Sequence, residues 1–424
     1  MKNELSSVLL RNTSLVLPDR TIDSANLLIQ NGRIAGISAP AQKTPTSQST
    51  IDLRGLTVFP GFIDVHIHGA VGVDTLNGSA EGLTKAAAFL AQHGVTAWLP
   101  TLVPARTEQY AQAIGAIGET MAASLAGDSD TDHQEAAHRL KSMLRARVLG
   151  VHYEGPFVND QQCGALHREH FRTFKSIAEF DSLPIINRSG AVHMMTLAPE
   201  IDGGIGLIKE LTKRGWIVSI GHTRATADLL DRAFAAGARH MTHFMNAMTP
   251  LHHRAPGPVG WGLLHDEVSC DLIADGIHLD RSILRLILRN KTSQRVSLIS
   301  DAIAATGLGD GEYEIWGEQI AVREGRTQNT KGSIAGSVIT MLDAVRLMSQ
   351  LGFADYELAQ MSSLNPARLL GIDHDCGSIE EGKRADLVVL DKDRNVYLTI
   401  IGGEIAFSAQ KQRGQATLPD PEVI

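Results

Sequence analysis

The chain has 424 residues, 43% of them hydrophobic and 20% charged, and its formal net charge at pH 7 is −8; this length allows one large globular domain and a smaller one. The negative charge gives no general reason to expect a nucleic-acid or anionic-membrane partner. Because the sequence has no signal-peptide core, no apolar run that could span a bilayer and only three widely separated cysteines, we expect a cytoplasmic protein with reduced thiols.

Short β-like runs occupy both ends of the chain. Near the N-terminus, Asn31-Gly32 separates two apolar runs, which is a strong signal for a β-hairpin. Residues 377–407 show the same alternation of short apolar runs with glycine-containing turns. We therefore predict a small β-rich domain, a β-sandwich, that is assembled from residues 1–59 and 375–424.

The middle of the chain, residues 60–374, alternates β-like runs with helical segments. Eight such units over about 250 residues predict a (β/α)8 barrel, the TIM barrel fold. A doubly wound open sheet is the main alternative, but no glycine-rich phosphate loop follows the first run. The expected strands are Phe62–His68, Val95–Thr101, Val148–Glu154, Val192–Ala198, Trp216–His222, His240–Phe244, Ser269–Asp275 and Val296–Asp301. The clearest helices are Ala80–Gln92, Ile201–Arg214, Thr226–Ala236 and Arg281–Asn290.

Histidines and carboxylates recur where the expected strands end. Barrel enzymes carry their chemistry at this face, the carboxyl end of the strands. A lone His-x-His pair is more often a hydrogen-bonded structural feature, but six polar side chains at matching positions favour a functional site. They are His66 and His68 on the first run, Glu154 on the third, His222 on the fifth, His243 on the sixth and Asp301 on the eighth.

The nitrogen and oxygen atoms of this set, with no sulfur, suit Zn²⁺ or another divalent transition ion better than Ca²⁺ or Mg²⁺. Glu154 could bridge two ions, one held by His66 and His68 and the other by His222 and His243. The sequence therefore predicts a site for one or two divalent ions, with zinc expected and iron, cobalt or manganese as alternatives.

Eight short motifs resemble those of one enzyme family. They are residues 60–69, 152–157, 196–200, 221–223, 242–248, 252–257, 273–278 and 300–302. They resemble the amidohydrolase superfamily and, within it, the N-acetylglucosamine-6-phosphate deacetylases. Glu154 stands where many amidohydrolases have a carboxylated lysine, while Asn246-Ala-Met and Ala274-Asp-Gly-Ile-His are similar to deacetylase motifs.

This resemblance implies a role for each candidate residue. Glu154, His222 and His243 would hold the metal found throughout the family, and Asp301 would be the general acid and base. His66 and His68 would add the second metal site that only some members have. The sugar phosphate would be bound by Asn246, Ala247, Arg254 and His278, with His253 beside Arg254. Residues 252–254 are otherwise most simply a solvated surface cluster.

One position departs from the family pattern. Members usually carry a histidine or glutamine near the substrate soon after the Glu-Gly-Pro motif, but here that place holds Leu166, and His167 follows it. Either His167 reaches the substrate or this contact is missing. The departure leaves the identity of the sugar and of the acyl group open.

The resemblance implies metal-dependent hydrolysis of N-acetyl-D-glucosamine 6-phosphate to glucosamine 6-phosphate and acetate, by a homodimer in which Arg254 serves the neighbouring subunit. Three alternatives remain: an N-acetylgalactosamine-6-phosphate deacetylase, an N-acyl-amino-acid amidohydrolase, and a non-catalytic barrel that binds no metal. Intact potential ligands argue against the last.

Overall fold

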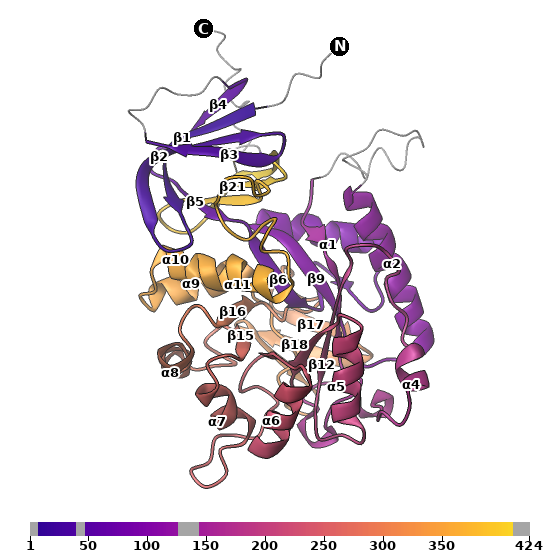
Figure 1. The fold of residues 1–424 in the computed structure, drawn as a ribbon. Coiled ribbons are helices and arrows are strands. Elements are labelled where there is room, and N and C mark those ends of the chain that lie inside the picture. Colours follow the sequence, from indigo (N-terminus) through magenta and orange to yellow (C-terminus); the bar gives the residue numbers. More distant parts are fainter. Residues whose placement is uncertain (1–6, 40–46, 126–143, 410–424) are drawn as a thin grey trace.

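The computed structural model describes residues 7–39, 47–125 and 144–409. Figure 1 shows two parts, a small sheet that combines indigo strands from the start of the chain with yellow strands from its end, and a barrel of strands with helices around it. The predicted fold class, a (β/α)8 barrel with a small β domain built from both ends of the chain, is confirmed.

The small sheet has the strand order β22-β21-β20-β5-β1-β2-β3, and β4 pairs with β1. Between β2 and β3, Asn31 and Gly32 have φ angles of 51° and 73°, as the predicted two-residue hairpin turn requires. Apolar side chains from both ends of the chain, among them Leu27 and Leu387, share one core, so each end stabilises the other. The strands are β1 (Ser7–Val16), β2 (Thr21–Gln30), β3 (Arg33–Ser38), β4 (Ser49–Asp52), β5 (Thr57–Pro60), β20 (Leu387–Leu390), β21 (Val396–Ile401) and β22 (Glu404–Ser408).

The chain passes from the small sheet to the barrel at Gly61. β5 ends at Pro60 and pairs with β20, and the first barrel strand begins at Phe62. A Cβ atom on Gly61 would lie 2.2 Å from Cγ2 of Thr96, so only glycine fits this close approach. The proposed domain limit after residue 59 falls one residue before the end of β5.

The barrel strands are parallel and follow the order β10-β9-β11-β12-β13-β14-β15-β16, with β6 paired to β9. The predicted run Val148–Glu154 is divided at Leu149 into two strands. Gly150, where the second begins, has φ of 155°, and a Cβ there would lie 1.9 Å from the Val192 carbonyl oxygen. The strands are β6 (Phe62–Ile67), β9 (Val95–Leu102), β10 (Arg147–Val148), β11 (Gly150–Glu154), β12 (Val192–Leu197), β13 (Ile217–Ile220), β14 (His240–Met241), β15 (Ser269–Ile273) and β16 (Val296–Ile299).

The last strand is tied to the first by individual hydrogen bonds. The Asp301 amide donates to the His66 carbonyl at 2.9 Å, and Ser300 Oγ donates to Asp64 Oδ2 at 2.6 Å. These bonds link β16 to β6 and place Asp301 next to the first histidine of the site.

Helices connect the strands and cover the outside of the barrel (Figure 1). Predicted helix 80–92 is found with those limits as α1, whose first turn is capped by Ser79. Gly237 ends α6. The helices are α1 (Ala80–Gln92), α2 (Thr107–Leu125), α4 (Ile177–Asp181), α5 (Gly204–Lys213), α6 (Ala227–Ala236), α7 (Gly257–Leu264), α8 (Arg281–Lys291), α9 (Met341–Gln350), α10 (Asp355–Ala359) and α11 (Asn365–Leu369). Among the described residues, no helix is long and apolar enough to cross a membrane.

A three-stranded antiparallel sheet lies between β16 and α9 and was not expected from the sequence. It consists of β17 (Gly311–Ile315), β18 (Glu318–Arg323) and β19 (Arg326–Asn329). Its buried side chains, among them Ile315 and Ile320, pack with Ile303 and Ala335 in a separate small core. Two two-residue strands, β7 (Gly69–Ala70) and β8 (Val73–Asp74), form a further hairpin after β6.

Candidate active site

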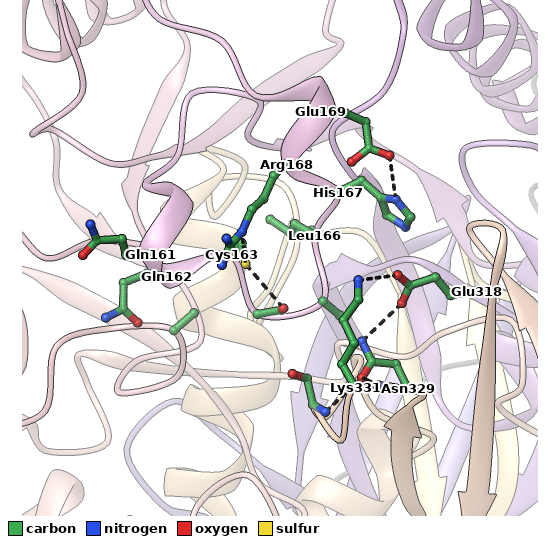
Figure 2. A pocket seen from close by; sticks show the side chains of 14 residues that line it. Gln161, Gln162, Cys163, Leu166, His167, Arg168, Glu169, Glu318, Asn329 and Lys331 are labelled. Carbon is green, nitrogen blue, oxygen red and sulfur yellow. Dashed lines mark hydrogen bonds and ion pairs between the residues drawn. The ribbon is translucent and has the colours of Figure 1, made fainter.

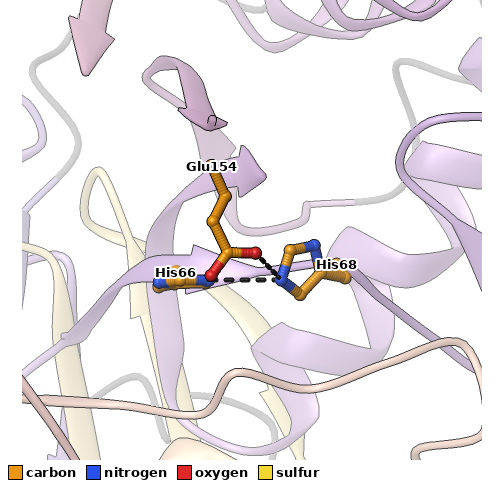
Figure 3. A group of neighbouring side chains, drawn as sticks. All are labelled: His66, His68 and Glu154. Carbon is orange, nitrogen blue, oxygen red and sulfur yellow. Dashed lines mark hydrogen bonds and ion pairs between the residues drawn. The ribbon is translucent and has the colours of Figure 1, made fainter. Parts of the chain in front are cut away.

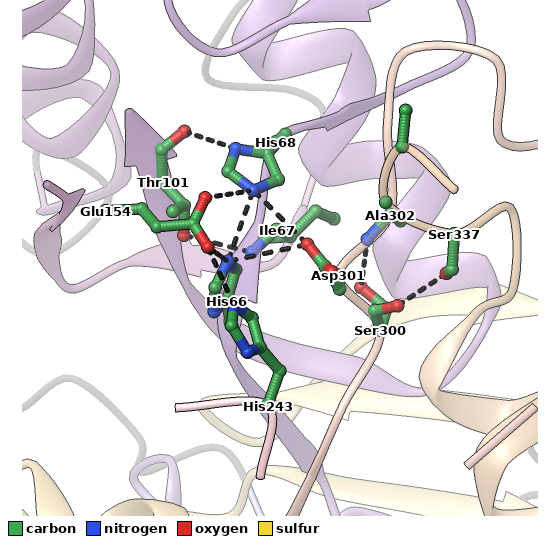
Figure 4. Close-up of polar contacts among 12 residues, drawn as sticks. His66, Ile67, His68, Thr101, Glu154, His243, Ser300, Asp301, Ala302 and Ser337 are labelled. Carbon is green, nitrogen blue, oxygen red and sulfur yellow. Dashed lines mark hydrogen bonds and ion pairs between the residues drawn. The ribbon is translucent and has the colours of Figure 1, made fainter. Parts of the chain in front are cut away.

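Six polar side chains meet at the carboxyl end of the barrel strands, where the sequence places its candidate metal ligands and base. None of the six is more than 7% exposed, and Figure 4 shows four of them around the Glu154 carboxylate. They are His66 and His68 at the end of β6, Glu154 at the end of β11, His222 after β13, His243 after β14 and Asp301 after β16.

The Glu154 carboxylate lies at the centre of the group. Its Oε1 is 2.9 Å from Nε2 of His222 and 2.9 Å from Nε2 of His243. On the other side, Nε2 of His66 is 3.5 Å from Oε1 and Nε2 of His68 is 3.3 Å from Oε2 (Figure 3). The carboxylate therefore joins two histidine pairs.

The chemistry of these donors fits a divalent cation. Nδ1 of His68 lies 3.2 Å from the Thr101 carbonyl and Nδ1 of His222 lies 2.7 Å from the Gln162 carbonyl. When each Nδ1–H donates to its carbonyl, the lone pair of each Nε2 points at a Glu154 oxygen. Two such acceptors repel each other unless a proton or a metal cation lies between them. Two sets of three have ligand atoms within 4.8 Å of one another: His66, His68 and Glu154, and Glu154, His222 and His243.

The charges in the site favour a cation as well. Burial opposes a charge on His68, but hydrogen bonds to Asp301 and Glu154 outweigh it and raise the pKa of His68 to about 10. Burial likewise opposes a charge on His243, yet its hydrogen bond to Glu154 raises its pKa to about 9. The carboxylates thus attract positive charge into a buried place, which a metal ion can supply instead of protons.

Asp301 stands beside this group without belonging to either set of three. Its Oδ1 is 3.4 Å from Nε2 of His66 and 3.2 Å from Nε2 of His68. Burial alone would raise the pKa of Asp301, but the neighbouring histidines lower it below the ordinary value. The group is therefore an ionised carboxylate at neutral pH and can accept a proton.

The backbone at several of these residues lies in the left-handed region. The φ angles are 48° at His222, 31° at His243, 49° at Ala247 and 50° at Asp301. Such conformations are costly for residues other than glycine and cluster at functional sites. They also explain why β13, β14 and β16 end before their histidine or aspartate, whereas the predicted strands included these residues.

Buried polar side chains of the barrel strands hydrogen-bond to residues in and next to the site. Asp64 binds Ser300, and burial raises the pKa of Asp64 to about 6 despite that hydrogen bond. Asp271 accepts from the His243 amide and lies 3.0 Å from Nε2 of His240. Neither aspartate was among the candidates predicted from the sequence. The period of two in Asp64-Val-His66, which places both side chains on one face, was the available signal for Asp64.

Two adjoining cavities open from the site. The cavity lined by five of the six site residues, all but His66, is here called the metal cavity; it has a volume of about 330 Å³ and is also lined by Leu166, Asn246, Ala247 and His278. Nδ1 of His278 is held 2.6 Å from Asp275 Oδ2. The structure thus brings three of the predicted substrate-binding residues to the metal cavity.

The second cavity, here called the outer pocket, has a volume of about 580 Å³ (Figure 2). His167 lines it rather than the metal cavity, and Nδ1 of His167 lies 3.2 Å from Glu169 Oε1. Lys331 contributes a cation from the loop after β19 and is paired with Glu318. Leu166 is buried and lines both cavities.

The structure does not bring Arg254 and His253 to the site of their own chain. Both are exposed on the loop between β14 and α7, and Arg254 Nη1 lies 2.8 Å from His253 Nε2. Neither residue lines the metal cavity or the outer pocket. Trp316, from the unexpected sheet, does line the metal cavity; no motif in the sequence pointed to it.

Comparison with known proteins supplies the context for this geometry. A family model described as the amidohydrolase family matches residues 57–406. The N-acetylglucosamine-6-phosphate deacetylase of Bacillus subtilis (strain 168) is 36% identical over 406 residues, which cover 96% of this chain and 98% of the relative. The N-acetylgalactosamine-6-phosphate deacetylase of Escherichia coli O157:H7 is 35% identical over 398 residues, 94% of this chain and 98% of the relative.

Solved structures agree with this result. The N-acetylglucosamine-6-phosphate deacetylase of Pasteurella multocida superimposes with a TM-score of 0.82 at 28% identity and covers 94% of this chain and 99% of its own. A variant of the Mycobacterium smegmatis enzyme in complex with N-acetyl-D-glucosamine-6-phosphate gives a TM-score of 0.83 at 30% identity, with 95% and 100% covered. The similarity therefore extends over nearly the whole chain.

Proposed function

This chain belongs to the amidohydrolase family, and from that premise we propose that it hydrolyses the acetamide of N-acetyl-D-glucosamine 6-phosphate, giving glucosamine 6-phosphate and acetate. The observation that carries this proposal is the buried Glu154 carboxylate between two histidine pairs, with Asp301 beside it. The nearly full-length similarity to deacetylases of amino-sugar phosphates supports the choice of substrate.

We propose that Glu154, His222 and His243 hold one divalent ion and that His66 and His68, with Glu154, hold a second. Three protein ligands leave room for water or substrate, which is the usual arrangement of a catalytic rather than a structural zinc site. When bound, such an ion polarises a carbonyl and lowers the pKa of water to about 7. Zinc is the proposed ion, because all donors are imidazole and carboxylate.

Asp301 performs the proton transfers of the proposed reaction. An amide is a poor electrophile with a poor leaving group, so the attacking water must lose a proton and the departing nitrogen must gain one. The ionised Asp301 carboxylate, which lies against His66 and His68, accepts the first proton and delivers it to the amine.

We propose that Asn246, Ala247 and His278 contact the sugar phosphate from the wall of the metal cavity. His167 lies in the adjoining outer pocket and would meet the substrate only there. The galacto isomer is a second candidate substrate, because the Escherichia coli galactosamine relative is nearly as similar as the Bacillus enzyme, 35% against 36% identical. A dianionic sugar phosphate does not cross a bilayer unaided, which agrees with the proposed cytoplasmic location.

The substrate proposal predicts a strong dependence on the phosphate group. N-acetylglucosamine 6-phosphate should be hydrolysed with a kcat/KM about 100-fold or more above that of free N-acetylglucosamine, because a bound phosphate makes several charge-assisted hydrogen bonds. The kcat/KM of acetate release is measured on four kinds of substrate: the phosphorylated sugar, the free sugar, N-acetylgalactosamine 6-phosphate and N-acetyl amino acids. Equal efficiency on phosphorylated and free sugar, or a preference for the amino acids, would reject the proposal.

We further propose that Arg254 binds the phosphate in the site of a neighbouring subunit, which makes the enzyme a homodimer at least. Arg254 is exposed and lines neither cavity of its own chain. Pro250 and Pro256 lie in its loop and Pro258 lies in the first turn of α7, and all three restrict the backbone. A guanidinium projected in this way suits bidentate phosphate binding.

A mixed dimer tests this proposal. Arg254→Ala and Asp301→Asn chains with different tags are produced together, and the dimer that carries both tags is purified. If Arg254 acts across the interface, one site combines Asp301 and Arg254, and the mixed dimer regains about half of the wild-type turnover under two-fold symmetry. A His278→Ala and Asp301→Asn pair is the control, and it should be no more active than its His278→Ala parent. A mixed dimer no more active than its parents would show that Arg254 does not serve the partner.

A further inference from the structure

The hairpin between β17 and β18 carries a tryptophan in an unusual place. Trp316 and Gly317 form its two-residue turn, with φ angles of 54° and 77°. Asn, Asp and Gly adopt this turn most readily, whereas a bulky residue at positive φ is a rare and costly choice. The contacts of the indole therefore account for a tryptophan at this position better than the geometry of the turn does.

The indole is fixed from two sides. Its Nε1–H donates to Asp74 Oδ2 at 2.8 Å, and the other oxygen of Asp74 accepts from the amides of Leu76 and Asn77 at 2.9 and 3.1 Å. The ring meets His68 edge to face, with 5.2 Å between the ring centres and 82° between the planes, a favoured aromatic arrangement. Trp316 is thus a rigid wall next to one of the proposed metal ligands.

Trp316 does not line the opening between the two cavities. The residues shared by the metal cavity and the outer pocket mark that opening: Gly164, Ala165, Leu166, Ala247 and Ser333. Trp316, His68 and Asp301 line only the metal cavity. Trp316 therefore bounds the metal cavity outside the part that opens to the outer pocket.

The position of the amide follows if the proposed function holds. Its carbonyl carbon must lie beside Asp301 for proton transfer. When the hexosamine phosphate is placed toward Ala247 and the larger outer pocket, the acyl chain is left with the part of the metal cavity that Trp316 and His68 line. We propose that Trp316 determines acyl specificity: its indole admits the two carbons of an acetyl group and excludes N-propionyl and longer acyl groups.

The test compares N-acetyl-, N-propionyl- and N-butyryl-glucosamine 6-phosphate, which all give glucosamine 6-phosphate on hydrolysis. One methylene in an apolar pocket changes kcat/KM by about 10–200-fold, so wild-type enzyme should prefer acetyl over butyryl by about 100-fold or more. In Trp316→Ala this ratio should fall at least about 10-fold. Trp316→Phe, which keeps an aromatic wall without the Asp74 hydrogen bond, should retain most of the preference.

Two further variants keep the test decisive. Tyr313→Ala changes the same hairpin at a residue outside the cavity lining, where the hydroxyl donates to the Gly309 carbonyl at 2.8 Å, and should leave the ratio unchanged. Trp316→Leu replaces the alanine variant if that protein does not fold. An acyl ratio equal to wild type in a folded Ala or Leu variant would overturn the inference.

The same assays distinguish an error in the proposed function from an error in the role of Trp316. A wild-type enzyme that forms no glucosamine 6-phosphate from the acetyl substrate would overturn both. Normal deacetylation combined with equal efficiency on butyryl and acetyl substrates would overturn the role of Trp316 alone.

Discussion

Replacing Asp301 by asparagine is expected to lower kcat by about 10²–10⁴-fold while the fold, the metal content and most of the substrate affinity remain. The amide has nearly the shape of the carboxylate and can occupy the same place, 3.4 and 3.2 Å from Nε2 of His66 and His68. It cannot, however, take up the proton of the attacking water. The loss should therefore appear in kcat more than in KM.

The measurement is steady-state acetate release, with metal content and thermal unfolding recorded on the same preparations. Asp310→Asn, an exposed carboxylate nine residues further along the chain, is the matched control and should behave as wild type. Near-normal turnover in Asp301→Asn would show that the base lies elsewhere. A simultaneous loss of metal would assign Asp301 to the ligands instead.

Removing a metal ligand is expected to have an effect of similar size through loss of the ion itself. Wild-type protein should contain about one to two equivalents of divalent metal, as expected for buried nitrogen and oxygen sites. His222→Ala or His243→Ala opens the set whose Nε2 atoms lie 2.9 Å from Glu154 Oε1. Because even residues that only orient a ligand contribute about 10–100-fold to metal affinity, a ligand itself should contribute at least that much.

Elemental analysis after dialysis measures the metal bound per chain, and activity should fall in proportion to the metal lost. His278→Ala is the matched control, since His278 lines the same cavity but belongs to neither set of ligands. It should keep the metal and weaken substrate binding. Unchanged metal content in both His222→Ala and His243→Ala would remove the basis of the assignment.

The fold could largely be predicted from the sequence, because the hydrophobic periodicity and the order of the elements along the chain determine it. Alternating apolar runs and helices marked all eight barrel units, and the helix predicted at 80–92 is found with those limits. The polar residues of the site were visible for the same reason, since each follows a strand in a barrel whose strand ends meet. The functional roles came from the family resemblance, not from this geometry.

What the sequence could not show depends on contacts between distant segments. The sheet β17–β19 interrupts the barrel pattern, so neither it nor Trp316 followed from an alternation of strands and helices. The carbonyl groups of Thr101 and Gln162 orient His68 and His222, but a backbone atom leaves no mark in a sequence motif. The positive φ angles at His222 and Asp301 likewise depend on surrounding packing, so the strand ends were placed too late.

The most direct test of the account is acetate release from N-acetyl-D-glucosamine 6-phosphate by the purified wild-type enzyme, before and after a chelator removes the metal. We expect acetate and glucosamine 6-phosphate in equal amounts, loss of this activity on chelation and its return when Zn²⁺ is added back. A metal-loaded enzyme that releases no acetate from this sugar phosphate, or one that works equally well after complete removal of the metal, would contradict the account.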